Sequence, residues 1–148
     1  MKILMIGLGS IGQRHLRNIR RLYGDSAEIL AYRVRRLKMT FSDTMQIREN
    51  VDLEKEYNLK VFTDLQQALN EKPDAAFICN VTGAHIPCAL EAAKAGCHLF
   101  LEKPISNTMD GVDELVKIAK EKNIKVFVGF QNRYNPALRA AKKYISEG

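Results

Sequence analysis

An apolar stretch that runs directly into a glycine pattern constrains this sequence more than any other feature. Residues Lys2–Ile6 read KILMI, and Gly7, Gly9 and Gly12 follow with G-x-G-x-x-G spacing. Residues 11–23 then carry apolar side chains at helical intervals. The glycines permit a tight turn, and the helix after them offers unpaired N–H groups to a phosphate. This order of strand, glycine turn and helix predicts a dinucleotide-binding loop; a methyl donor or similar nucleotide-like ligand is the alternative.

The rest of the chain alternates short apolar runs with helical patterns. The runs expected to form strands are residues 2–6, 28–32, 59–62, 75–79, 98–101 and 125–130. Helical patterns cover residues 11–23, 87–95 and 109–122, and a capping box at Asp64 and Gln67 opens a short helix. Continuous apolar strands separated by helices predict an α/β fold with a doubly wound parallel sheet. Right-handed crossovers give its six strands the order 3-2-1-4-5-6.

Composition limits the class of protein. The 148 residues are 46% apolar and 27% charged, which is typical of one globular domain. No stretch reaches the roughly 18 apolar residues of a membrane span, and the N-terminus does not resemble a signal peptide, so we expect a cytoplasmic protein without a membrane partner. Three cysteines without CxxC spacing predict buried, reduced thiols, and no metal site is expected.

The net charge of +6 is concentrated in one region of the chain. Between residues 14 and 38, eight basic residues accompany two acidic ones, and the rest of the chain sums to zero. The basic residues are Arg14, Arg17, Arg20, Arg21, Arg33, Arg35, Arg36 and Lys38. No helix-turn-helix, zinc or RNP-type pattern accompanies them, so nucleic acid is not the expected partner. The charge favours an anionic small ligand or a solvated helix face.

The residue expected to choose between dinucleotide cofactors lies at the end of the second predicted strand. An acidic residue is typical about 20 positions after the glycines, where it holds the adenosine ribose. Arg33 occupies roughly that place, with Arg35 and Arg36 close behind. A guanidinium attracts a 2′-phosphate, which favours NADP or the use of both cofactors. The alternative is that these arginines form a basic surface loop.

The apolar run at residues 99–101 ends abruptly in Glu102, Lys103 and Pro104. A lysine at the end of a strand is usually only solvated. The carboxyl end of a parallel strand, however, is where such sheets bind ligands. Lys103 is therefore a candidate site residue.

The three histidines carry weaker signals. His15 falls within the first predicted helix and is expected on its face, and His98 begins a strand and is expected to be structural. His85 follows a loop and precedes a helix, so the sequence leaves its role open between structure and ligand binding.

Three stretches together resemble one enzyme family. They are IGLGSIGQRH at the start, ICNVTGAHIPCALEAAKAGCHLFLEKPIS in the middle and VGFQNRYNP near the end. They are similar to the glucose-fructose oxidoreductase, inositol dehydrogenase and rhizopine catabolism protein family, over residues 1 to about 136. The resemblance implies a Rossmann-type fold and an enzyme. Its activity would be NAD(P)-dependent hydride transfer between nicotinamide and the hydroxyl or carbonyl of a sugar or sugar derivative.

The resemblance also implies roles for individual residues. Lys103 of the E-K-P motif would be the catalytic residue, because it would contact the reacting oxygen. The expected cofactor-binding residues, with Arg33 added from its position, are Gly7, Gly9, Ser10, Ile11, Gly12, Arg33, Asn80, Thr82, His85, Glu102, Pro104 and Arg133. The family pattern further implies a cis peptide bond between Lys103 and Pro104.

Family members carry a second domain that binds the sugar and makes oligomer contacts. We therefore expect residues 1–135 to be the NAD(P)-binding domain and residues 136–148 to begin the connection to a second domain. The expected partners are a sugar or sugar-nucleotide substrate and further copies of the parent protein in a homo-oligomer. The 148-residue chain alone would then be inactive. The alternative is a freestanding NAD(P)-binding sensor or regulatory module, which would have no need of a lysine beside the nicotinamide.

Overall fold

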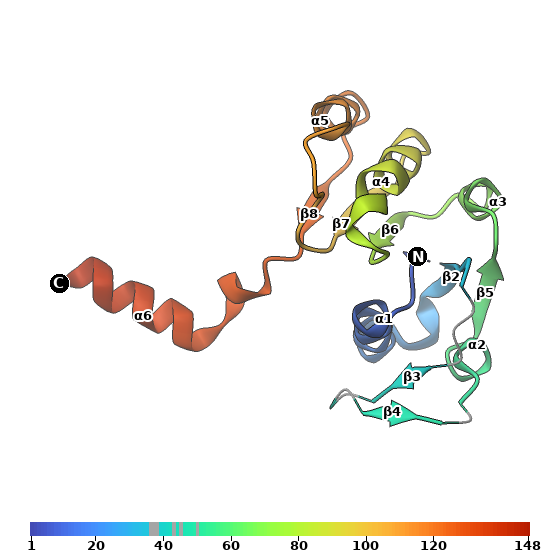
Figure 1. The fold of residues 1–148 in the computed structure, drawn as a ribbon, viewed down its shortest axis with the longest axis horizontal. Helices are drawn as coiled ribbons and strands as arrows, with labels where there is room; N and C mark the ends of the chain where they lie inside the picture. Colours follow the sequence, from blue (N-terminus) through green and yellow to red (C-terminus); the bar gives the residue numbers. More distant parts are fainter. Residues whose placement is uncertain (36–38, 43, 45, 50) are drawn as a thin grey trace.

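Six parallel strands form one sheet in the order β5-β2-β1-β6-β7-β8 (Figure 1). The computed structural model describes residues 1–35, 39–42, 44, 46–49 and 51–148. The strands of the sheet are β1 (Lys2–Ile6), β2 (Glu28–Tyr32), β5 (Leu59–Phe62), β6 (Ala75–Ile78), β7 (His98–Leu101) and β8 (Val126–Val128). Counted along the chain, these six strands have the predicted order 3-2-1-4-5-6, so the predicted doubly wound sheet is confirmed.

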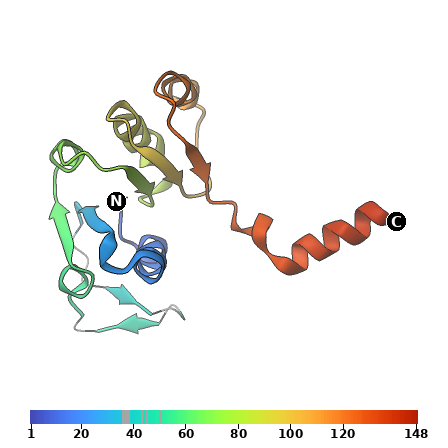
Figure 2. The same cartoon turned by 180° about the vertical axis from the view of Figure 1, so that it is seen from behind.

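Helices cover both faces of this sheet (Figures 1 and 2). They are α1 (Ser10–Tyr23), α2 (Leu53–Glu56), α3 (Leu65–Asn70), α4 (His85–Lys94), α5 (Val112–Glu121) and α6 (Pro136–Glu147), with short 3-10 turns η1 (Gly24–Ser26), η2 (Thr82–Ala84) and η3 (Gln131–Tyr134). Alternate residues of a strand point to opposite faces. Leu4 and Ile6 accordingly pack with α3, α4 and α5, whereas Ile3 and Met5 pack with α1 and α2.

A two-stranded antiparallel hairpin, which the sequence did not predict, lies beside α1. Its strands are β3 (Thr40–Phe41) and β4 (Ile47–Arg48). The buried Gln13 of α1 holds this segment, because its Nε2 donates to the Met39 carbonyl at 2.9 Å and its Oε1 accepts from the Phe41 N–H at 2.8 Å. The hairpin is thus held by a polar residue of a helix that is far from it in sequence, rather than by its own apolar pattern.

Part of the basic region is used inside the fold, whereas Arg14, Arg21 and Arg35 are exposed, so an anionic ligand or a solvated helix face stays a prediction for those residues. Arg17 is buried, and its Nη1 donates to the Phe41 carbonyl at 2.8 Å. Arg20 donates to backbone carbonyls just before β2 and just before β5. Arg36 and Lys38 lie outside the described residues. Arg17 and Arg20 therefore satisfy backbone carbonyls that would otherwise lack donors.

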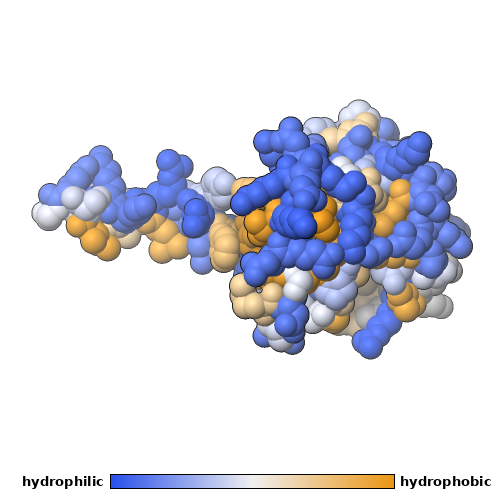
Figure 3. Space-filling model, turned by 90° about the horizontal axis from the view of Figure 1, so that it is seen from above, coloured by the Kyte–Doolittle hydropathy of each residue, from blue (hydrophilic) through white to orange (hydrophobic). Residues whose placement is uncertain are grey.

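Helix α6 projects away from the body of the protein (Figures 1 and 2). The Asn135 side chain caps it by accepting from the N–H groups of Ala137 and Leu138, and a proline at its first position is pre-organised for the helix. All its residues are exposed, including the apolar Leu138 and Ile145. Figure 3 shows apolar surface along one side of the projecting segment. Residues 136–148 were expected only as the start of a connection, and all of them except Gly148 form this helix.

The three cysteines are free thiols, as the sequence predicts. Burial raises the pKa of Cys79 to about 12 and that of Cys97 to about 11, and it also raises the pKa of the half-buried Cys88. Because the thiolate is the reactive form, we expect all three to resist a disulfide exchange reagent at about pH 8. In denaturant all three should react within minutes. Rapid labelling of the folded protein would contradict this prediction.

Candidate active site

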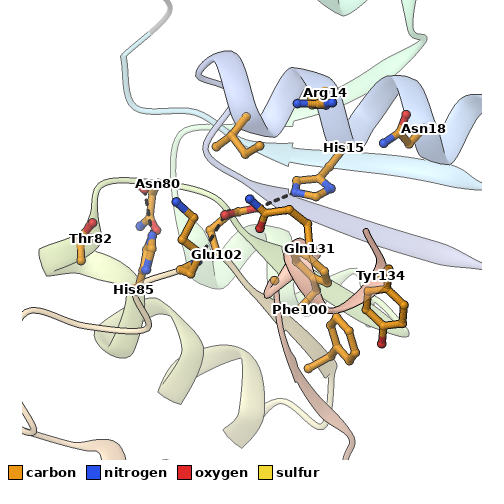
Figure 4. A pocket seen from close by; sticks show the side chains of 14 residues that line it. Arg14, His15, Asn18, Asn80, Thr82, His85, Phe100, Glu102, Gln131 and Tyr134 are labelled. Carbon is orange, nitrogen blue, oxygen red and sulfur yellow. Dashed lines mark hydrogen bonds and ion pairs between the residues drawn. The ribbon is translucent and has the colours of Figure 1, made fainter. Parts of the chain in front are cut away.

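A pocket of about 670 Å³ lies between α1 and the loops that follow β6, β7 and β8. Its lining residues are Ile11, Arg14, His15, Asn18, Asn80, Thr82, His85, Phe100, Glu102, Lys103, Phe127, Gly129, Gln131 and Tyr134. Figure 4 shows these side chains around one space, with α1 on one side and the Asn80 loop on another. The pocket is at the carboxyl edge of the parallel strands, where open sheets of this kind bind ligands.

The glycine pattern closes one end of this site. Gly7 has φ +89°, and a Cβ there would lie 2.7 Å from the backbone N and Cα of Asn80. A Cβ on Gly12 would lie 2.2 Å from the Gly7 carbonyl oxygen. At Gly9, by contrast, a Cβ would meet nothing within 4 Å. Two of the glycines are therefore required by the fold, whereas the third leaves open space that a ligand can approach.

Helix α1 begins beside this open space. Its N-cap is Gly9, which provides no side-chain hydrogen bond, and its first turn has no acidic residue. The Gln13 N–H donates to the Gly9 carbonyl at 2.9 Å, and the N–H groups of Ser10 and Ile11 come before this bond in the first turn. Unpaired N–H groups and the positive end of the helix dipole favour an anion. The predicted pyrophosphate loop thus has the shape and polarity that a dinucleotide needs.

Asn80 and Thr82 form the opposite wall of the pocket (Figure 4). The Asn80 amide donates to the Ala84 carbonyl at 3.3 Å and to Cys88 Sγ at 3.2 Å. Its Oδ1 is buried and has no hydrogen-bond partner among the described residues. A buried acceptor without a partner is unfavourable, so a ligand hydroxyl or amide is expected to donate to it. Dinucleotide cofactors carry both groups, and the residues present therefore fit such a cofactor.

The E-K-P motif turns sharply at the end of β7. The Lys103–Pro104 peptide bond is cis, as the family resemblance implies. Glu102 uses both carboxylate oxygens: Oε1 lies 2.6 Å from His15 Nε2, and Oε2 accepts from the Lys103 N–H at 3.2 Å. The exposed Lys103 ammonium has no hydrogen bond or ion pair to any described residue. Because its neighbouring carboxylate is engaged elsewhere, this ammonium is available to a ligand.

His15 belongs to the site, and sequence reasoning did not identify it. It was expected only on a helix face, yet it bonds Glu102 across 87 positions of sequence. Its ring also contacts Phe100, with centroids 4.8 Å apart in an edge-on arrangement. Helical spacing could have predicted this position. His15 is four residues after Ile11, so both side chains lie on the same face of the helix.

An aromatic row, of which Phe100, Phe127 and Tyr134 line the pocket, was also not predicted. Phe77, Phe100 and Phe127 occupy matching positions on β6, β7 and β8, and their rings follow one another at 4.9 and 5.7 Å. Tyr134 continues the row 6.5 Å beyond Phe127, which is 47% exposed. These rings are neighbours because of the register in which the strands pair. That register could not be predicted from a single sequence.

Arg33 is placed differently from the expectation of a freely available guanidinium. Its side chain is only 7% exposed, and Nη1 lies 3.0 Å from Glu54 Oε1 of α2. It does not line the pocket. Arg35, two residues later, is exposed. The end of β2 therefore presents a guanidinium that already has a counter-ion.

Arg133 is not brought to the pocket with the other predicted residues. Its guanidinium lies over the Phe130 ring at 5.9 Å, and it lines a separate hollow between η3 and α6. Gln131 and Tyr134 of the same turn line the pocket instead. Six of the predicted residues line the pocket: Ile11, Asn80, Thr82, His85, Glu102 and Lys103. Gly7, Gly9, Ser10, Gly12 and Pro104 belong to the adjoining turns and are not among its lining residues.

A parallel six-stranded sheet with a glycine loop, an open helix N-terminus and an unpaired buried acceptor defines a dinucleotide-binding protein. Residues 1–130 match the family described as "Oxidoreductase family, NAD-binding Rossmann fold", the glucose-fructose oxidoreductase, inositol dehydrogenase and rhizopine catabolism group. The chain belongs to this family. The resemblance noted in its motifs is thereby confirmed, and NAD binding is the property that the family description carries.

Individual relatives agree with this assignment. An uncharacterized oxidoreductase, YrbE of Bacillus subtilis, is 30% identical over 97% of this chain and 39% of its own length. The myo-inositol 2-dehydrogenase of Thermotoga maritima is 29% identical over 100% of this chain and 41% of its own. The chain therefore spans about 40% of the length of the curated relatives it matches.

Solved structures show the same architecture. Scyllo-inositol dehydrogenase from Lactobacillus casei, with bound NAD(H) and scyllo-inositol, superposes with a TM-score of 0.77 at 27% identity, over 100% of this chain and 41% of that one. The WlbA dehydrogenase from Bordetella pertussis, in complex with NADH and UDP-GlcNAcA, superposes with a TM-score of 0.79 at 27% identity, over 100% and 40%. Within the described residues, no helix is long and apolar enough to cross a membrane.

Proposed function

We propose that residues 1–135 are the cofactor-binding domain of an oxidoreductase. It transfers hydride between a nicotinamide and a hydroxyl or carbonyl of a sugar or sugar nucleotide. Residues 136–148 begin the connection to a substrate-binding domain. The observation that carries the proposal is the Lys103 ammonium, unpaired among the described residues, in the same pocket as the partnerless Asn80 Oδ1. Relatives that bind inositol or a sugar nucleotide support the substrate class.

The residues of the pocket have separate tasks in this proposal. The α1 N-terminus and Gly9 receive the pyrophosphate, and Asn80 accepts a hydrogen bond from the nicotinamide half. A bound nicotinamide supplies the hydride acceptor or donor. Lys103 donates to the substrate oxygen, where its positive charge stabilises the negative charge that develops as hydride moves. A sensor would need only the binding of the pyrophosphate and of the nicotinamide half. The Lys103 ammonium, unpaired among the described residues, serves the contact with the substrate oxygen.

Cofactor choice follows from the Arg33–Glu54 pair. We propose that NADP(H) binds at least as well as NAD(H), with Arg33 turning from Glu54 to the 2′-phosphate. Because Glu54 competes for the guanidinium, Glu54→Gln should strengthen NADP(H) binding. Arg33→Ala should weaken it by about tenfold or more, the value of a charged hydrogen bond of roughly 1.5–3 kcal/mol. Calorimetric titration of the 148-residue chain with NADH and NADPH measures both effects.

Two controls sharpen this titration. Glu56→Gln removes a similar ion pair from the same helix, between Glu56 and Arg48 at 2.9 Å, and should leave both affinities unchanged. S-adenosylmethionine tests the competing methyl-donor interpretation of the glycine loop and should not bind. Binding of the methyl donor in place of NADH would reject the proposed function. A preference for NAD(H) that neither the Arg33 nor the Glu54 variant alters would reject only the cofactor choice.

A further inference from the structure

The first residue of α4, His85, has a contact at each ring nitrogen. Its side chain is 2% exposed. Nδ1 lies 2.9 Å from the Pro104 carbonyl oxygen, and Nε2 lies 3.0 Å from the Asn80 carbonyl oxygen. A carbonyl oxygen only accepts, and a neutral imidazole has one donor and one acceptor nitrogen. We infer that His85 is an imidazolium that donates to both carbonyls and joins the Asn80 loop to the E-K-P turn.

The neutral ring is the less favourable alternative at this position. It would point a nitrogen lone pair at a carbonyl oxygen about 3 Å away, in a place that water does not reach. A buried charge is itself unfavourable unless it is hydrogen-bonded. Here both N–H groups have an acceptor at good distance, and charge-assisted bonds are the stronger kind. The other titratable or charged groups that line the pocket are Arg14, His15, Glu102, Lys103 and Tyr134, and the Glu102 carboxylate among them is bonded to His15 and to the Lys103 N–H.

The two carbonyls belong to the residues that the proposed function uses. One is the carbonyl of Asn80, whose side-chain Oδ1 awaits a donor, and the other directly follows Lys103 in the chain. His85 therefore sets the separation between the residue that binds the nicotinamide half and the residue that contacts the substrate oxygen. It acts as a positioning residue, and this step rests on the proposed function.

The chain contains an internal comparison for the protonation state. Nδ1 of His98 accepts from the Lys125 N–H at 3.0 Å, so that nitrogen carries no proton and the ring is neutral. His15 has a polar contact from Nε2 to Glu102 Oε1 at 2.6 Å. The three histidines should therefore give different nitrogen spectra in a single sample, and His98 serves as the neutral reference.

Nitrogen-15 NMR of the labelled 148-residue chain at neutral pH tests the protonation state. We expect two protonated ring nitrogens for His85, with the near-equal shifts of an imidazolium. His98 should show the unequal shifts of a neutral ring protonated at Nε2. Assignment by His85→Gln and His98→Gln identifies each signal. A neutral His85 ring with one bare nitrogen would overturn the inference, whether or not the chain binds a nicotinamide cofactor.

A binding comparison tests the positioning role. Glutamine has one donor and one acceptor end, so His85→Gln keeps at most one of the two bonds. NADH affinity should fall by about tenfold, the value of a lost hydrogen bond from a charged group. Affinity for ADP, which lacks the nicotinamide half, should stay within about twofold. His98→Gln should change neither.

The possible outcomes separate the two proposals. Equal losses of NADH and ADP affinity in the His85 variant would mean that the residue only supports the fold. Unchanged NADH affinity would mean that His85 does not position the Asn80 loop and the E-K-P turn for the cofactor. Failure of the unsubstituted chain to bind NADH would reject the proposed function, while the NMR result would still decide the protonation state.

Discussion

Replacing Lys103 by alanine is expected to lower turnover by about 10²–10⁴-fold in a protein that includes the downstream sequence, the usual contribution of a positioned acid–base group. The reason lies in the position of the ammonium. It is exposed to the pocket, and the adjacent Glu102 carboxylate is taken up by His15 and by the Lys103 backbone N–H. Under the proposed function, alanine removes the hydrogen bond to the substrate oxygen, and we expect it to leave the fold and the glycine loop intact.

Binding and turnover should separate in this variant. NADH affinity of the 148-residue chain should change by no more than about twofold with Lys103→Ala, because the pyrophosphate and adenosine contacts are made elsewhere. The exposed Lys117 of α5 lies outside the pocket, so Lys117→Ala is a matched control that should leave turnover unchanged. Steady-state NAD(P)H absorbance measures the rates. Full activity of the Lys103 variant would reject its catalytic role.

The 148-residue chain by itself should not turn over any sugar. Hydride transfer needs the substrate held in a near-attack position, and such positioning lowers a barrier by roughly 7–11 kcal/mol. Under the proposed function, the substrate-binding domain supplies that position, and in this chain the η3 turn that lines the pocket is exposed. Substrate-dependent NADPH formation by this chain alone would show that the site is more complete than proposed.

The sheet could be predicted because its strands are short apolar runs with clear boundaries. Handedness and the glycine loop then restrict the strand order to one solution. The segment between β2 and β5 could not be predicted in the same way. Its hairpin is held by Gln13 and Arg17 of α1, through polar bonds to backbone atoms that no periodicity signals. Tertiary hydrogen bonds decided the local structure there.

The candidate site was predicted where a residue type must follow a strand end, and missed where two distant elements meet. Lys103 of the E-K-P turn belongs to the first kind, whereas the Asn80 loop was expected only from the resemblance to the family. The His15–Glu102 contact and the aromatic row belong to the second, because each depends on how α1 and the strands are set against one another. The role of Arg33 could not be predicted from its place in the sequence alone. Its partner Glu54 belongs to α2, a helix that the sequence did not predict.

Substituting the glycines one at a time should separate cofactor binding from folding. At Gly12, a Cβ would overlap the Gly7 carbonyl oxygen, so Gly12→Ala must push α1 away from the first loop. Overpacking of this kind costs about 1–3 kcal/mol. In a domain of this size, that lowers the melting temperature by about 2–4 °C for each kcal/mol. NADH binding should be lost with it, because the helix N-terminus moves.

Gly9→Ala should do the opposite. Gly9 has φ −69° and ψ −170°, which any residue adopts, and its added Cβ would meet no atom within 4 Å. The melting temperature should therefore stay the same. The methyl group would nevertheless occupy the space through which a pyrophosphate approaches the backbone, so NADH affinity should fall by about tenfold or more. Calorimetric titration and thermal unfolding of the two variants provide the measurement. Unchanged NADH affinity in the Gly9 variant would mean that the open space beside α1 does not receive the pyrophosphate.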